Sequence, residues 1–126
     1  MAESKNIIEK INHFLEKSNC SDFRIKSFDG FKLHLIGSFD LCYYHEVEIV
    51  FNGVYKISME IDFFVDCDKK PFQFHKADKA NADCDNEMIK IIILDGTNTK
   101  QSIICQDIDL IVGRVKYYDN TGNRIL

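Results

Sequence analysis

Two three-residue clusters constrain the fold of this chain more than any other feature of its sequence. Phe28-Asp29-Gly30 and Phe51-Asn52-Gly53 each separate two runs in which apolar and polar residues alternate. Such alternation is typical of β-strands, and Asp-Gly or Asn-Gly between two strands is typical of a tight hairpin turn. We therefore predict two consecutive hairpins, over residues 22–36 and 43–61.

The length of the first loop decides which side chains share a face, because a shift of one residue turns every side chain over. A two-residue loop at Asp29 and Gly30 would place charged and apolar side chains together. A three-residue loop over 28–30, closed by Gly30 in the left-handed conformation, instead pairs Ile25 with Leu33. This register separates an apolar face from a polar face, so we prefer it.

The second cluster favours the same loop length. A loop over 51–53 pairs Val47 with Ile57 and places His45 opposite Met59 on the apolar side. Two interpretations of His45 follow: a core histidine with a satisfied hydrogen bond, or a member of a ligand pocket. For the second interpretation, the predicted ligand-binding residues are Tyr43, His45 and Met59.

The polar sides of the two predicted hairpins carry opposite charges. The first side is basic and the second is acidic, so that a basic ribbon borders an acidic one. This surface is either a solvated face with weak cross-strand neutralisation or a docking surface for a charged protein. For the docking surface, the predicted contact residues are Arg24, Lys26, Lys32, Glu46 and Glu48.

The segments around the hairpins complete the predicted fold. Apolar residues at helical spacing predict a helix over residues 4–18, capped by Ser4 and ended near Asn19. Residues 62–87 lack periodicity and are predicted to be irregular, with a short helix around 74–82. Residues 88–118 are predicted to form further strands. The last of these strands has apolar residues on both sides, which is typical of a central or doubly covered strand. Gly113 is predicted to mark a bulge in this last strand.

We therefore predict one α+β domain over residues 1–126, in which an N-terminal helix packs on a mainly antiparallel β-sheet built from consecutive hairpins. The chain has 126 residues, of which 45% are hydrophobic, and this suits one compact core. The net charge of -4 argues against binding to nucleic acid, which needs a dense basic field. No apolar run is long enough for a membrane span and the N-terminus lacks a signal peptide, so we expect a cytoplasmic protein that does not bind membranes.

Five cysteines without close pairs are typical of a reducing compartment. Cys67 and Cys84 each lie between two aspartates, and flanking carboxylates disfavour the reactive thiolate. The triplets 66–68 and 83–85 would form a metal site if they met in space, but they lack the Cys-x-x-Cys spacing of structural zinc sites. We therefore expect no metal and no cofactor.

Catalytic motifs are absent from the sequence. There is no phosphate-binding Gly-rich loop, no Gly-x-Ser-x-Gly and no His-Glu-x-x-His. His45 and Glu46 are consecutive, and consecutive side chains of a strand point to opposite faces, so the two do not act together on one substrate. We expect no catalytic residues.

A resemblance supports a binding role. Residues 39–49, together with Val54-Tyr55-Lys56-Ile57 and the later pairs Ile108-Asp109 and Tyr117-Tyr118, resemble small uncharacterised bacterial proteins. Compact families with a similar Tyr-His-acid strand resemble immunity proteins, which neutralise a toxin. The predicted function is thus a non-catalytic protein-binding domain, immunity-like or inhibitory. The alternative is a small-ligand-binding protein or an enzyme that uses a pocket around His45 and Tyr43.

Overall fold

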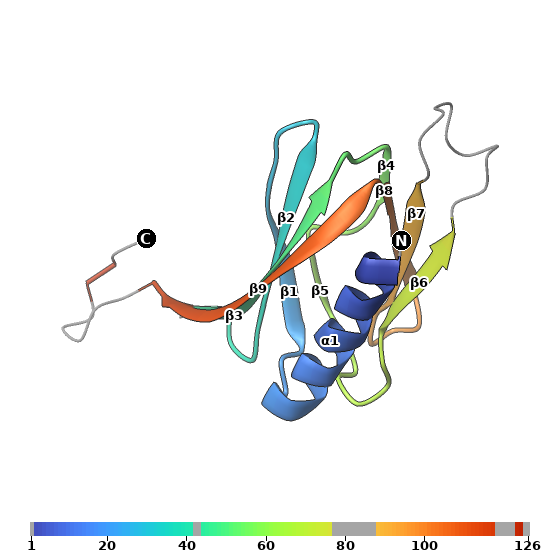
Figure 1. The fold of residues 1–126 in the computed structure, drawn as a ribbon. Coiled ribbons are helices and arrows are strands. Elements are labelled where there is room, and N and C mark those ends of the chain that lie inside the picture. The colour runs from blue at the N-terminus through green and yellow to red at the C-terminus, as the bar shows by residue number, and fades with distance from the viewer. Residues whose placement is uncertain (1, 42–43, 77–87, 118–122, 125–126) are drawn as a thin grey trace.

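The computed structural model describes residues 2–41, 44–76, 88–117 and 123–124. It contains one N-terminal helix, α1 (Ala2–Ser18), and two antiparallel β-sheets (Figure 1). The predicted α+β fold, with a helix packed on a mainly antiparallel sheet, is confirmed.

We call the two sheets sheet A and sheet B. Sheet A has the order β5-β1-β2-β3-β9, with β5 (Asp62–Phe64), β1 (Asp22–Phe28), β2 (Lys32–Ser38), β3 (Tyr44–Asn52) and β9 (Asp107–Lys116). Sheet B has the order β4-β8-β7-β6, with β4 (Lys56–Ser58), β8 (Lys100–Cys105), β7 (Ile89–Leu94) and β6 (Phe72–Lys76).

The chain passes from one sheet to the other at a corner formed by Gly53 and Gln106. Gly53 joins β3 to β4 with a φ of 62°, in the left-handed region that favours glycine. The Gln106 backbone N–H donates to the Asn52 carbonyl at 2.9 Å, which holds the two crossing segments together. A Cβ on Gly53 would lie 2.5 Å from the Gln106 side chain. The corner therefore needs glycine for both its backbone conformation and its close packing.

The core lies between the two sheets and the helix. One cluster of buried side chains contains residues of all three layers. Ile8, Ile11 and Leu15 come from α1, and each is at most 3% exposed. Inward-facing residues of sheet A and of sheet B complete the cluster, so the helix closes the space between the sheets.

The helix follows its predicted apolar stripe but begins two residues earlier than predicted, at Ala2. Ser4 is thus buried within the first turn and is not the cap. Asn19 has a φ of 54°, which confirms the predicted end of the helix. The Asn12 side chain donates to the Phe72 carbonyl at 2.8 Å and accepts from the Phe72 N–H at 3.0 Å. This pair of hydrogen bonds fixes α1 to β6.

The first hairpin exists, but its predicted register is wrong. Phe28 pairs with Leu33, and Ile25 pairs with Leu35 and not with Leu33. The loop is longer than predicted because the Asp29 carboxylate accepts hydrogen bonds from the backbone N–H groups of the third and fourth loop residues, Phe31 and Lys32. The extra residue is absorbed by a bulge between Ile25 and Ser27. The apolar and polar faces stay separated, because the shift at Ile25 is an even number of residues.

The predicted second hairpin, over residues 43–61, is wrong. β3 pairs with β2 on one side and with β9 on the other, and does not pair with β4. Ile57 lies opposite Ile103 of β8 and not opposite Val47. The physical reason is burial: β3 is an interior strand of sheet A with β2 and β9 as its two neighbours, whereas β4 has three residues and offers a short ladder.

Two further predictions about the second half need correction. The segment predicted to be irregular contains β5 and β6, so residues 74–76 are strand and not helix; residues 77–87 lie outside the described part. The last strand, β9, was predicted to be central or doubly covered, but it lies at the end of sheet A and its residues 111–116 are exposed. The predicted bulge at Gly113 is confirmed, since the register shifts between Val112 and Val115.

Candidate functional site

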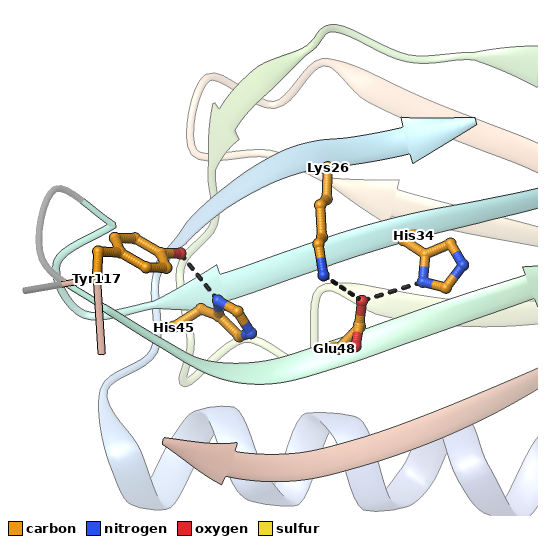
Figure 2. A network of polar contacts seen from close by, with 5 residues as sticks. All are labelled: Lys26, His34, His45, Glu48 and Tyr117. Atoms are coloured by element: carbon orange, nitrogen blue, oxygen red, sulfur yellow. Dashed lines mark hydrogen bonds and ion pairs between the residues drawn. The ribbon is translucent and has the colours of Figure 1, made fainter. Parts of the chain in front are cut away.

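The outer face of sheet A, which is turned away from α1 and sheet B, carries most of the ion pairs between described residues. At its centre Glu48 of β3 contacts Lys26 at 3.5 Å and the His34 ring at 3.0 Å (Figure 2). Burial alone would raise the pKa of Glu48, but the His34 hydrogen bond and the Lys26 charge lower it below its ordinary value. The carboxylate thus stays ionised and joins three strands.

A second cluster lies where β3 and β9 leave the core. Arg114 donates to Glu46 at 2.9 Å, and its guanidinium lies 4.5 Å from the centre of the Tyr44 ring. Arg114 reaches this position because the β9 bulge places both Gly113 and Arg114 opposite Glu46. The arginine remains half exposed, so a cation and an aromatic ring are both presented to solvent.

The predicted contact residues lie on this outer face. Arg24 pairs with Asp62 of β5 at 2.6 Å and is half exposed, and Lys32 is exposed at the start of β2. The structure therefore brings the predicted basic and acidic ribbons side by side. Arg114 and Tyr44 were not among the predicted contact residues, although the predicted bulge at Gly113 was a signal that the side chains of this strand change face there.

His45 lies on the opposite face, toward the core, and is 6% exposed. Its ring Nδ1 lies 2.8 Å from the hydroxyl oxygen of Tyr117, as Figure 2 shows. Burial lowers the pKa of His45 below its ordinary value and raises the pKa of Tyr117. Both groups are therefore held in their neutral forms.

The predicted ligand-binding residues are not brought together in the described structure. His45 lies opposite Val115 of β9, so its predicted pairing with Met59 is wrong. Met59 instead packs against the core in the connection between β4 and β5. Tyr43 lies outside the described residues. The prediction of a ligand pocket around these three residues remains untested.

Two open clefts lie elsewhere. One, of about 630 Å³, lies between the start of α1 and the start of β9 and is lined by Glu3, Asp107 and Asp109 together with Lys32 and uncharged residues. The other, of about 320 Å³, is an apolar depression beside β1 and β5. Neither is lined by His45 or Met59. The first cleft is acidic and suits a cationic side chain.

Two of the described cysteines lie in the core. Cys20 and Cys105 are fully buried, and burial raises the pKa of each thiol to about 12. Cys67 is a free thiol at an intermediate exposure. The triplet 83–85 and Cys42 lie outside the described residues. Within the part of the chain that the structure describes, no three His, Cys, Asp or Glu side chains are grouped so as to hold a metal ion.

Among the described residues, no helix has the length and apolar character needed to cross a membrane. Comparisons with protein-family models, with curated proteins and with solved structures found no match to this chain. The surface chemistry of the described residues is therefore what indicates a function.

Proposed function

We propose that this chain is a non-catalytic protein-binding domain that contacts its partner through the outer face of sheet A. The observation that carries the proposal is the arrangement of half-exposed cations on β1 beside carboxylates on β3, on a face that is not covered by α1 or sheet B. A broad sheet face suits a macromolecule better than a small molecule, which is usually enclosed in a concave pocket.

The residue types at the edge of this face support the proposal. Tyr and Arg are enriched at the energetic centres of protein interfaces, and Tyr44 lies under Arg114 here. Ile111, which is 54% exposed, is paired with Glu48 on the same face. An aromatic residue, a cation and an aliphatic residue are thus presented together.

The charge pattern of this face indicates the charge expected on the partner's surface. Arg24 and Lys26 form a basic end, whereas Glu46 and Glu48 carry the negative charge toward the middle of the sheet. Complementary charges increase the rate and specificity of association more than its affinity. We expect a partner with an acidic region facing Arg24 and Lys26, and the resemblance to immunity proteins suggests a toxin.

The alternative, a ligand site or active site around His45 and Tyr43, has weaker support. The His45 ring is buried and its Nδ1 already contacts the Tyr117 hydroxyl. A histidine whose pKa is lowered by burial is neutral near pH 7, and the described contact of this ring is with a hydroxyl group and not with a carboxylate that would orient it as a base. We also propose the cytoplasm as the location, in agreement with the free described cysteines.

The test is capture of the partner from a lysate of the source cells on immobilised protein, with identification by mass spectrometry. We expect one protein to be retained in stoichiometric amount. The double variant Arg24→Glu with Lys26→Glu should weaken its binding at least about tenfold, or about 1.4 kcal/mol. Binding of the identified partner is then measured by calorimetry with purified proteins.

The matched control is Lys5→Glu with Lys10→Glu, which makes the same change of charge at two exposed positions of α1. It should leave the affinity unchanged. Absence of a stoichiometric partner, or equal loss of binding in both double variants, would contradict the proposal.

A further inference from the structure

We propose that the cleft between the start of α1 and the start of β9 binds a linear polyamine, a molecule whose ammonium groups are separated by alkyl chains. Three carboxylates line this cleft, those of Glu3, Asp107 and Asp109. Its volume of about 630 Å³ lies within the range of small-molecule sites, roughly 300–1,000 Å³. The site is separate from the surface proposed above for a protein partner, because neither Arg24 nor Lys26 lines it.

The carboxylates of the cleft have no counter-charge in the described structure. None of the ion pairs between described residues includes Glu3, Asp107 or Asp109. Asp107 Oδ1 and Asp109 Oδ2 accept from the Asn52 amide at 2.7 and 3.0 Å, and this donor is neutral. The other oxygen of each carboxylate has no described donor. An ionised carboxylate accepts several hydrogen bonds, so both aspartates keep capacity for a cationic donor.

Two positive features of the cleft leave this charge largely uncompensated. Lys32 also lines the cleft, but it lies opposite Asn52 in one ladder, and Asn52 lies opposite Asp107 in the next. Neighbouring strands are about 4.8 Å apart, so Lys32 is roughly 10 Å from Asp107 across the sheet. The N-terminal end of α1 carries the positive end of the helix dipole, and Glu3 in the first turn offsets it.

Ser4 gives a second, independent indication of a ligand. It lines the cleft, is 5% exposed, and its hydroxyl group has no hydrogen-bond partner among the described residues. Buried hydroxyl groups normally have a partner. The described side-chain atoms that are both unpartnered and fully enclosed belong to Glu46 and Asn52, so the Ser4 oxygen remains in contact with the cleft. A bound ammonium group, which donates up to three hydrogen bonds, supplies the missing partner.

The positions of the carboxylates favour a long cation over a metal ion. In the described part of the chain, Glu3, Asp107 and Asp109 are not grouped closely enough to hold one ion together. The two aspartates are two residues apart on one side of β9, or about 6.6 Å, and Glu3 comes from α1. Ammonium groups spaced along one chain reach such separated charges, whereas a single lysine side chain carries one charge. Phe31, which is 53% exposed and lines the cleft, offers an apolar surface to the alkyl segments.

The test is isothermal titration calorimetry of the purified chain with spermidine at low ionic strength, where charges are least screened. We expect one spermidine to bind per chain, and butylamine, which has one ammonium group, to bind at least about tenfold more weakly. Asp109→Asn and Glu3→Gln should each weaken spermidine binding at least about threefold, since each removes one charge and keeps the side-chain shape. Ser4→Ala should weaken it at least about fivefold, because it removes a buried acceptor.

The controls distinguish a site from general attraction of a polyamine to an acidic chain. Glu9→Gln and Asp68→Asn make the same changes of charge at exposed positions that do not line the cleft. Both should bind spermidine as wild type does. Circular dichroism of every variant separates weaker binding from loss of folding.

Three results would each overturn the proposal. They are no saturable binding of spermidine by wild type, equal affinity for spermidine and butylamine, and the same loss of binding in the control variants as in the cleft variants. None of these results would alter capture of a protein partner through Arg24 and Lys26, so the two proposals fail separately.

Discussion

At the scale of single residues, His45 is a buried histidine whose ring contacts the hydroxyl group of another side chain. It lies near the end of the core, beside Tyr117, and is 6% exposed. A buried imidazole is more costly to protonate than one in water, which is the physical cause of its lowered pKa. The unfolded chain therefore binds a proton at His45 more readily than the folded chain does.

This difference predicts a pH dependence of stability. The ordinary pKa of the histidine is 6.5, and the folded value is lower. As the pH falls through about 6.5, the unfolded state takes up more protons, so the free energy of unfolding decreases until the pH passes the folded pKa. We expect this decrease between about pH 7 and pH 5 to be smaller in His45→Gln than in wild type. Urea unfolding at several pH values measures it.

The control for this prediction is His13→Gln, because His13 is exposed on α1. It should leave the pH dependence of wild type unchanged in the same window. The carboxylates Glu48 and Asp95 do not obscure the effect, since their pKa values are lowered and their stabilising contributions are lost only at a lower pH. An equal slope in wild type and His45→Gln would contradict the prediction.

At the scale of elements, the turn between β7 and β8 depends on one carboxylate. Asp95 Oδ1 accepts hydrogen bonds from the Thr97 N–H at 2.9 Å and from the Thr99 N–H at 3.0 Å. Its Oδ2 accepts from the buried Gln101 side chain at 3.0 Å, and the Gln101 oxygen accepts from the Glu60 N–H at 2.6 Å. One side chain thus joins the turn to the connection between β4 and β5.

Replacing Asp95 with alanine should lower the free energy of unfolding by about 1–3 kcal/mol, because it leaves the buried Gln101 donor without its acceptor and removes the hydrogen bonds to the turn backbone. The measurement is urea unfolding followed by circular dichroism. Asp68→Ala removes an exposed carboxylate from another loop, and we expect it to change stability by less than about 0.5 kcal/mol. Equal stability of the two variants would mean that the Asp95 network contributes nothing to the turn.

The strands themselves show what the sequence predicts well. Alternation identified which side chains of β1, β2 and β3 face the core, and Leu33 and Val47 are fully buried. It did not identify the register, because a shift of two residues preserves every face. The hydrogen bonds of the Asp29 carboxylate to the loop backbone belong to the observed turn and not to the predicted one. Such bonds depend on side-chain geometry that a pattern of apolar residues does not contain.

At the scale of the whole molecule, the main error concerned how strands far apart in sequence meet. Asn52-Gly53 is typical of a hairpin turn, yet in the structure it forms the corner at which the chain leaves sheet A for sheet B. Both structures need a glycine with positive φ, so the local signal is the same. What decides between them is the pairing of β3 with β9, more than fifty residues later in the chain. The predicted contact residues nevertheless lie on one face, because the side of the sheet toward which each of these side chains points follows from the alternation of apolar and polar residues.

The helix gives the last prediction, since it joins the layers of the fold. Asn12 exchanges two hydrogen bonds with the backbone of Phe72, as a neighbouring strand would, at the edge of sheet B. Phe72 is 2% exposed, so water does not readily replace the lost partner. We expect Asn12→Ala to lower the free energy of unfolding by about 1–3 kcal/mol. It should also speed hydrogen exchange at the Phe72 amide, as measured by NMR.

The neighbouring position supplies the control for this contact. His13→Ala removes an exposed side chain from the same turn of α1, and we expect a change in stability of less than about 0.5 kcal/mol. Alanine favours the helix in both variants, so an effect on helix propensity would appear in both and cancel in the comparison. A specific loss in Asn12→Ala therefore measures the docking of the helix on β6. If the Phe72 amide exchanged at the wild-type rate in Asn12→Ala, the helix would have to be held by its apolar stripe alone.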